Sequence, residues 1–305
     1  MLKLIIFTAM EGDTVLIEAV RYGQLEAVRY LLSTYGININ ARNSGGATAL
    51  LVAVQDGHVE IVRCLVGARA NINYINETVD RTTPLIEAAW QGNLDVVCLL
   101  VDAAAIVDAT DSRGTTALMI AAQEGEADIV EFLVGQHGWD HDAKDHEGFT
   151  ALMEAVRSGH QAIVEYLVGQ GAASVNAANN QGSTAIMIAS EFNRIEIVQY
   201  LVNQRGSVEA RDHNATTALM IAAAHGHREV LRVLLAENGA RATIDFANFE
   251  GNTALYYAAL WGLRSGTLEL WRWLDGERRN WIPVLHAEIV KVLRGGSTGM
   301  MQRLM

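Results

Sequence analysis

The chain has 305 residues, of which 50% are hydrophobic and 19% are charged. An excess of 35 acidic over 23 basic residues gives a formal net charge of −12 at pH 7. This charge disfavours binding to nucleic acid and to anionic membranes and favours basic partners, while the apolar content is sufficient for a continuous core.

One motif occurs eight times along the chain, and each copy opens with Thr-x-Leu or Thr-x-Ile. The steps between successive copies are 34, 35, 33, 34, 34, 33 and 36 residues. A period this steady predicts stacked supersecondary units rather than separate globular domains. The opening threonines are Thr14, Thr48, Thr83, Thr116, Thr150, Thr184, Thr217 and Thr253.

We divide the chain into a lead-in over residues 1–13, an array of eight repeats over residues 14–296 and a tail over residues 297–305. The apolar part of the lead-in runs into Glu11 without a small-residue cleavage site, so it does not predict a signal peptide. No apolar run approaches about 18 residues, so no transmembrane helix is expected. Cys64 and Cys98 form no CxxC pair, which favours a reducing compartment. We therefore expect a cytoplasmic location, with the nucleus as the alternative.

Each copy opens with a short predicted helix, represented by residues 116–124. The Thr116 hydroxyl is suited to cap this helix, because it can accept a hydrogen bond from a backbone N–H two or three residues on. Gly125 is expected to end it in a left-handed conformation, which Asn193 in the matching position of copy six also tolerates. The remaining copies have Gly23, Gly57, Gly92, Gly159, Gly226 and Gly262 at this position.

A second predicted helix follows each turn and has a broader apolar face, as at Ile129, Val130 and Leu133. Copies two and three have Arg69 and Ala104 where a closing glycine is expected. Because each helix is only about nine or ten residues long, it is too short to be stable alone and depends on stacking. Glycines suited to close the second helix in a left-handed conformation are Gly36, Gly138, Gly171, Gly206 and Gly239.

The succession of Thr-x-Leu, paired alanines, a glycine turn, Ile-Val-x-x-Leu and a polar connection resembles the ankyrin repeat. The resemblance extends from residue 12 to about residue 296, nearly the whole chain. It implies an all-α solenoid in which each unit has two antiparallel helices and a short β-hairpin finger. It also implies a curved stack that binds other proteins through its fingers and first-helix surface.

The sequence departs from the family's Thr-Pro-Leu-His opening, which keeps its proline only at Pro84. An apolar residue replaces the histidine in every copy, which predicts apolar packing in place of a polar tie. Four consecutive copies have methionine there. We favour methionines that fill the core, and the alternative is a methionine strip that binds partners. The eight residues are Ile17, Leu51, Ile86, Met119, Met153, Met187, Met220 and Tyr256.

Two segments depart from the period. The finger over residues 74–82 is lengthened, which fits a partner contact or a tolerated loop insertion, and we favour the insertion. In the last copy, residues 263–285 separate Gly262 from His286, where other copies have a tight turn. One hypothesis is a loop that docks on the end of the array. The other is an error in the gene model, which we favour because the repeat closes when this insert is removed.

The two residues before each turn glycine vary between copies, whereas the framework residues repeat. The family presents this pair on its concave face, so we predict that the pair contacts a partner protein; the alternative is a solvated helix end. Aromatic and arginine residues are the usual hot spots, which favours Tyr22, Trp90 and Phe192, and equally Arg157. The predicted set is Arg21, Tyr22, Gln55, Asp56, Trp90, Gln91, Gln123, Glu124, Arg157, Glu191, Phe192, His225 and Trp261.

Charged residues at the finger tips are expected to form a solvated rim in which each contributes little. These residues are Arg42, Asp80, Arg81, Asp111, Arg113, Asp145, Glu147, Arg211 and Asp212.

The sequence contains one cluster that resembles a metal site. Three histidines within residues 137–146 lie among acidic residues, but this spacing fits a polar finger equally well, and no metal is expected. His58, His160 and His227 recur after the turn glycine, which indicates a structural role. Phosphate-binding, dinucleotide-binding, zinc-protease and serine-hydrolase motifs are absent from the sequence, so we predict neither a catalytic residue nor a cofactor.

We therefore predict a non-enzymatic, monomeric scaffold or adaptor that binds a partner protein on its concave face and fingers. Neither nucleic-acid binding nor membrane insertion is expected. The alternative is that the array is a targeting portion, or a fragment, of a larger effector such as a kinase or ubiquitin-ligase subunit. An enzyme in its own right is the third hypothesis.

Overall fold

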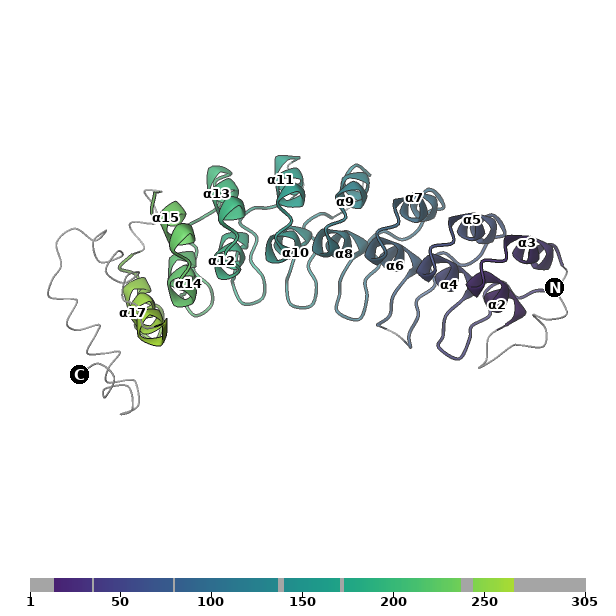
Figure 1. Ribbon diagram of the computed structural model, residues 1–305, viewed down its shortest axis with the longest axis horizontal. Helices are drawn as coiled ribbons and strands as arrows, with labels where there is room; N and C mark the ends of the chain where they lie inside the picture. The colour runs from purple at the N-terminus through teal and green to yellow at the C-terminus, as the bar shows by residue number, and fades with distance from the viewer. Residues whose placement is uncertain are drawn as a thin grey trace. The chain divides into compact units, whose positions relative to one another are not determined.

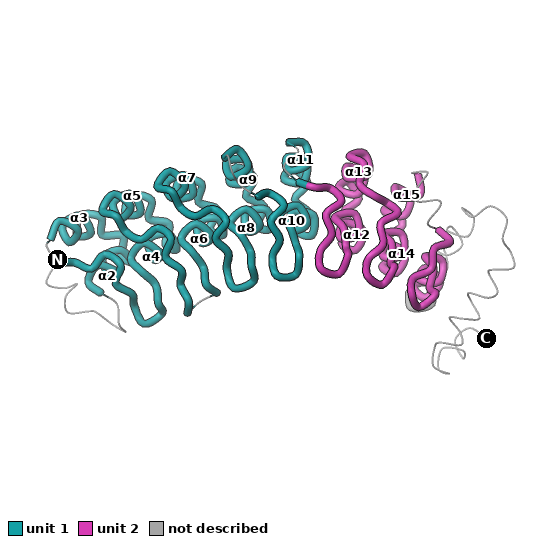
Figure 2. The backbone as a smooth tube through the Cα atoms, turned by 180° about the vertical axis from the view of Figure 1, so that it is seen from behind, with its two compact units in different colours: residues 1–173 teal, residues 174–305 magenta. Residues whose placement is uncertain are grey.

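A computed structural model describes residues 14–34, 36–78, 80–136, 140–170, 173–236 and 244–265, with side chains described as far as Gly262. The chain forms two units, residues 1–173 and residues 174–305 (Figure 2). Both are built from pairs of short α-helices, and the described ranges contain no β-strand. The all-α fold class is therefore confirmed. The lead-in, the tail and all but the first three residues of the predicted insert lie outside the described residues.

The described residues of unit 1 form five helix pairs. The first helices of successive copies pack against one another in one layer, and the second helices pack in another layer (Figure 1). The first helices are α2 (Val15–Arg21), α4 (Ala49–Gln55), α6 (Pro84–Trp90), α8 (Ala117–Glu124) and α10 (Ala151–Ser158). The second helices are α3 (Leu25–Ser33), α5 (Val59–Gly67), α7 (Leu94–Asp102), α9 (Ala127–Val134) and α11 (Gln161–Gly169).

Unit 2 repeats the same arrangement. Its first helices are α12 (Ala185–Glu191), α14 (Ala218–His225) and α17 (Ala254–Ser265). Its second helices are α13 (Ile195–Asn203) and α15 (Arg228–Ala236). Helix α14 packs against both α12 and α17, and α13 packs against α15, so each helix contacts its counterpart in the next copy.

The opening threonines cap the first helices as predicted in seven of the eight copies. Their Oγ1 atoms accept a hydrogen bond from the backbone N–H three residues on, at 3.2–3.4 Å. This bond satisfies one of the N–H groups that the first turn of a helix leaves without a partner. Thr184 is the exception, because its buried Oγ1 has no hydrogen-bond partner among the described residues.

The predicted apolar faces form the core. Leu133 and Leu167 are fully buried between the layers, and the four methionines are only 0–2% exposed. The interpretation that these methionines fill the core is therefore confirmed, and a methionine strip for partner binding is excluded. These methionines are Met119, Met153, Met187 and Met220.

The turns after the first helices have the predicted left-handed conformation where they are described. Gly125 has φ of 88°, and Asn193, the one non-glycine at this position, has φ of 55°. Gly262 was wrongly predicted to end its helix. Helix α17 instead continues through Gly262 to Ser265, so this glycine lies inside the helix rather than at its end.

Closure of the second helices follows the prediction only in part. Gly36 is left-handed, with φ of 92°, and so are the non-glycine residues Arg69 and Ala104, with φ of 63° and 64°. The prediction for Gly206 is wrong, because the preceding residue, Arg205, adopts the left-handed conformation. Gly206 is required for space instead, since a Cβ there would lie 2.5 Å from Cδ1 of Ile186. The remaining three glycines of this set lie outside the described residues.

The predicted β-hairpin fingers are turns rather than paired strands. Four of them are closed by one isolated antiparallel bridge each, as between Thr110 and Thr116. An aspartate or asparagine five residues before the threonine closes the finger by accepting a hydrogen bond from the N–H four residues on, at 2.7–2.9 Å. These residues are Asn43, Asp111, Asp145, Asn179, Asp212 and Asn248.

The prediction that the charged finger-tip residues form a solvated rim is therefore wrong for three of these residues. Asp111 is 8% exposed, and its Oδ1 accepts hydrogen bonds from the N–H groups of Arg113 and Thr115, both at 2.8 Å. Asp145 and Asp212 are half-buried and make the same pair of bonds in their own fingers. These carboxylates hold the finger backbone, because a tight turn leaves its N–H groups without backbone partners.

Successive fingers are joined by backbone hydrogen bonds. In unit 1 the Ser112 N–H donates to the Asp80 carbonyl, and the His146 N–H donates to the Arg113 carbonyl, both at 2.8 Å. Unit 2 has the equivalent bonds from His213 to Gln181 at 2.9 Å and from Phe249 to Asn214 at 3.0 Å. Backbone bonds therefore join the fingers over residues 76–82, 111–115 and 145–149 of unit 1 in one row, and those over residues 179–183, 212–216 and 248–252 of unit 2 in another.

Candidate functional site

The predicted partner-binding residues lie at the C-terminal ends of the first helices, except for Trp261, which lies within α17. The three aromatic side chains Tyr22, Trp90 and Phe192 are 66%, 57% and 44% exposed. The side chains that are also exposed are Arg21, Gln55, Asp56, Gln91, Glu124, Glu191 and His225. Those that are half-buried are Gln123, Arg157 and Trp261.

Two pockets lie in unit 1 where the first helices meet the fingers. The first, which we call the α6 pocket, has a volume of about 330 Å³. It brings together two predicted residues, Gln55 and Trp90, that lie one repeat apart in the sequence. Its lining residues are Gln55, Asp80, Thr82, Ile86, Glu87, Trp90, Asp111, Arg113 and Ile120.

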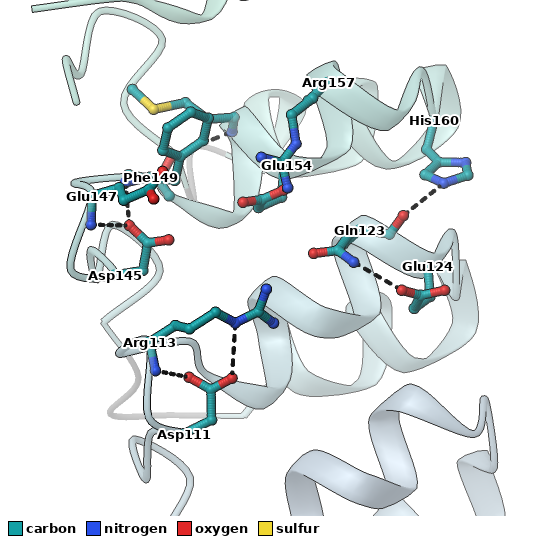
Figure 3. A network of polar contacts seen from close by, with 12 residues as sticks. Asp111, Arg113, Gln123, Glu124, Asp145, Glu147, Phe149, Glu154, Arg157 and His160 are labelled. Carbon is teal, nitrogen blue, oxygen red and sulfur yellow. Dashed lines mark hydrogen bonds and ion pairs between the residues drawn. The ribbon is translucent and has the colours of Figure 1, made fainter. Parts of the chain in front are cut away.

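The second pocket, which we call the α10 pocket, has a volume of about 270 Å³ and brings together the predicted residues Gln123 and Arg157. The finger residue Arg113 lines both pockets. The other side chains that line the α10 pocket are Ser112, Thr115, Asp145, His146, Glu147 and Glu154. Figure 3 shows most of these side chains.

Sequence reasoning missed the buried glutamates of the first helices. Glu18, Glu87 and Glu154 lie four residues after their opening threonines and are 5%, 8% and 5% exposed. The copies between them have aliphatic residues at this position, such as Val52 and Ile120. The signal was available, because a carboxylate at an otherwise apolar position is buried at a cost unless it finds a partner.

Glu154 finds its partner within its own helix. Nη2 of Arg157 lies 2.5 Å from Oε2 of Glu154 and forms an ion pair with it (Figure 3). The Arg157 guanidinium also lies over the Phe149 ring, 5.3 Å from its centroid. Burial raises the pKa of Glu154, opposed by Arg157 and reinforced by Asp145. The carboxylate is therefore held in a site that disfavours its charge unless a cation is present.

The recurring histidines connect one copy to the copy before it. Nε2 of His160 lies 3.0 Å from the carbonyl oxygen of Gln123, and Nε2 of His227 lies 3.1 Å from that of Glu191. Because a carbonyl only accepts, both Nε2 atoms donate. A structural role is confirmed for these two histidines. His58 differs, since its buried Nε2 has no hydrogen-bond partner in the described part of the chain.

Trp261 of the last copy packs on the preceding turn glycine in the way that His160 does, although it is not at the same position of the repeat. A Cβ on Gly226 would overlap the Trp261 indole, just as a Cβ on Gly125 would overlap the His160 ring. Trp261 therefore packs on the turn glycine of the preceding copy, and part of its surface is used inside unit 2.

The described residues contain no group of three or more His, Cys, Asp or Glu side chains placed to hold a metal ion. Residues 137–139, part of the histidine-rich segment, lie outside the described ranges. Cys64 and Cys98 are both free thiols. Within the same described ranges, no helix has the length and apolar character needed to cross a membrane.

Capped helix pairs that stack through an apolar interior and carry tied fingers define a helical-repeat protein of the solenoid class. A family model for ankyrin repeats, in groups of three copies, matches residues 2–76, 69–145, 85–179, 118–212, 173–245 and 204–274. The chain belongs to the ankyrin-repeat family, whose members generally mediate protein–protein interactions and are typically non-catalytic.

Similar proteins contain the repeats within longer chains. Potassium channel AKT2/3 of Arabidopsis thaliana is 35% identical over 126 residues, 41% of this chain and 15% of the channel. Ankyrin repeat domain-containing protein 63 of Mus musculus is 34% identical over 128 residues, 40% of this chain and 32% of that protein. Ankyrin repeat and KH domain-containing protein mask-1 of Caenorhabditis elegans is 30% identical over 130 residues, 43% of this chain and 5% of that protein. The chain spans less than a third of the length of each.

Proposed function

We propose that the chain is a non-enzymatic scaffold or adaptor that binds a partner protein on the face formed by its first-helix ends and fingers. The observation that carries this proposal is the α6 pocket. It places an indole that is 57% exposed beside buried carboxylates and a finger arginine. Exposed tryptophan and arginine at a pocket are the residue types that dominate binding energy in protein interfaces.

The exposed aromatics recur at the same end of the first helices. Tyr22, Trp90 and Phe192 all lie at the C-terminal end of a first helix or one residue beyond it. Large aromatic side chains gain substantial free energy on burial, so their recurrence at the equivalent position of the repeat in both units supports a surface that a partner covers.

The charge of the chain supports a protein partner rather than a nucleic acid or membrane. At −12, the chain repels phosphate backbones and anionic lipid, and it attracts basic protein surfaces. The proposed adaptor acts as a monomer, in the cytoplasm or the nucleus.

A second candidate is that the array is the targeting portion, or a fragment, of a larger effector. The observation in its favour is that the similar proteins carry these repeats within much longer chains, including a channel and a KH-domain protein by name. In both candidates the first-helix and finger face binds the partner.

Affinity capture tests this proposal. Partners retained by the wild-type chain should be lost with Trp90→Ala/Phe192→Ala, because both substitutions remove exposed aromatic surface from the proposed binding face. Tyr30→Ala is the matched control, since Tyr30 is 58% exposed but lies on the second helix α3. Retention of the same partners by all three proteins would remove this face from consideration.

A further inference from the structure

At two positions of the first helix, an acidic and a basic residue tend to occur together in the same copy. Copies one and five have glutamate four residues after the threonine and arginine seven residues after it. Copy three has the glutamate, Glu87, but has Trp90 in place of the arginine. Copies two, four, six and seven have an aliphatic residue at the first position and no base at the second. The two complete pairs are Glu18 with Arg21 and Glu154 with Arg157.

Copy five shows how such a carboxylate is satisfied. The Arg157 guanidinium contacts Glu154 at 2.5 Å and lies 5.3 Å from the centroid of the Phe149 ring. Arg157 thus bridges a buried carboxylate and an aromatic ring at the edge of the α10 pocket (Figure 3). Stacking of arginine on an aromatic ring recurs at Arg42, whose guanidinium lies 5.4 Å from the Tyr74 ring.

Copy three lacks that cation. Glu87 is 8% exposed and lines the α6 pocket, and no cation of the described residues lies within ion-pair distance of it. Its Oε1 accepts one long hydrogen bond, at 3.3 Å, from Nε2 of Gln91. The base at the pocket, Arg113, pairs with Asp111 at 3.5 Å. With Asp80, the pocket holds three carboxylates and one arginine.

We propose that the α6 pocket binds an arginine side chain of the partner protein, with its guanidinium on the Glu87 carboxylate and against the Trp90 indole. The partner arginine then does in copy three what Arg157 does for Glu154 in copy five. This inference rests on the proposed function, since it names the group that the first-helix and finger face recognises.

Arginine fits the pocket better than lysine for geometric reasons. Its planar guanidinium can donate two parallel hydrogen bonds to one carboxylate and can stack on an indole at the same time. Lysine presents a compact ammonium that makes neither contact as well. A neutral side chain would leave the buried carboxylate without its countercharge.

The inference is tested with peptides selected from a random displayed library on the full-length chain. Enriched peptides should share an arginine. Replacing that arginine by citrulline should weaken binding about tenfold or more, because a charge-assisted bond to a buried carboxylate is lost, and lysine should give a smaller loss. Binding is measured by calorimetry.

Protein variants locate the arginine in the pocket. Glu87→Gln should weaken the arginine peptide about tenfold and should abolish the difference between the arginine and citrulline peptides. Glu154→Gln is the matched control, because its carboxylate already has Arg157, and it should leave the affinity unchanged. Trp90→Arg should block the peptide by supplying the missing cation from the chain itself. Thermal melts of each variant establish that it is folded.

The outcomes separate the arginine pocket from the proposed function. A library without arginine-dependent binders, or equal affinity of the arginine peptide for wild type and Glu87→Gln, would overturn the arginine pocket. If the selected peptides lacked a required arginine but still lost affinity for Trp90→Ala/Phe192→Ala, the first-helix and finger face would remain the binding surface. If partner capture survived that double substitution, the proposed function itself would fail.

Discussion

At the scale of residues, each repeat is held by a few side chains that bond to the backbone. The Thr116 hydroxyl caps α8, and the Asp111 carboxylate holds the finger before it. Helix starts and tight turns leave backbone N–H groups without partners, and each such cap contributes about 1 kcal/mol. The threonine was visible in the sequence as a helix start. The aspartate was assigned to a solvated rim because charge alone does not reveal its bonds to its own turn.

The buried glutamates show where residue-level prediction stopped. Trp90 lies three residues after Glu87 on α6, so the sequence places both on one helical face. Arg113 and Asp80 come from two different fingers, and their approach to α6 follows only from the stacking of copies. Trp90 was therefore predicted from local sequence, whereas Glu87 was missed and the finger residues Arg113 and Asp80 could not be assigned to this pocket.

His227 is expected to make the stability of the fold depend on pH. Burial lowers the pKa of His227, opposed by its bond to the Glu191 carbonyl and reinforced by His225. The unfolded chain therefore binds this proton more readily than the folded chain. The neutral His227 imidazole therefore stabilises the folded chain at pH values above its ordinary pKa of about 6.5. This contribution to stability is lost as the pH falls through about 6.5 toward the lower pKa of the folded chain. His227→Gln should reduce the fall in the denaturation midpoint between pH 7 and pH 5. An unchanged pH dependence would show that this imidazole does not control it.

At the scale of elements, the helices were predictable because both of their ends are marked. A threonine starts each first helix, and glycine or Asn193 ends it in the left-handed conformation, so the bounds follow from local chemistry. The predictions failed at Gly206 and Gly262. There the glycine serves close packing against Ile186 or lies within a continuing helix. Sequence alone cannot distinguish a glycine needed for its backbone angles from one needed for space.

The left-handed alanine that follows α7 provides a test at this scale. Ala104 is exposed and has φ of 64°, a conformation that costs an ordinary residue about 1–2 kcal/mol. Ala104→Gly should raise the free energy of unfolding by about 0.5–1 kcal/mol, after allowing for the greater freedom of glycine in the unfolded chain. The neighbouring substitution Ala103→Gly, at φ of −85°, should lower it instead. Chemical denaturation of both variants measures the difference, and equal effects would contradict the argument.

At the scale of the whole molecule, stability comes from contacts between neighbouring copies. Each helix is short, and its apolar face is buried by the other helix of its own copy together with the helices of the adjacent copies in its unit. The periodic sequence predicted this stacking reliably. It did not reveal what the array binds, because the framework residues that repeat are the ones that carry no specificity.

A core substitution tests how far this dependence spreads. Leu133 is fully buried in α9, which packs against α7, α8 and α11. Leu133→Ala should cost about 2–5 kcal/mol. Amides of α7 to α11 should lose protection from hydrogen exchange more than those of α3, which lies three copies before α9 in unit 1. Glu131→Ala, at an exposed position of the same helix, should leave protection unchanged. Uniform loss across unit 1 would indicate all-or-none unfolding of that unit instead.

The bonds between fingers have a consequence for how such a surface can change over generations. Neighbouring finger tips are joined through main-chain atoms, as between Ser112 and the Asp80 carbonyl. Nearly every amino acid supplies the same N–H and carbonyl groups, so substitutions at the tips leave this joint in place. A tip side chain is not needed where main-chain atoms make the joint, although Arg211 also donates a hydrogen bond from its guanidinium to the Ala247 carbonyl of the next copy, at 2.6 Å. Selection can then alter what the face recognises by single substitutions while the stack that presents it stays the same.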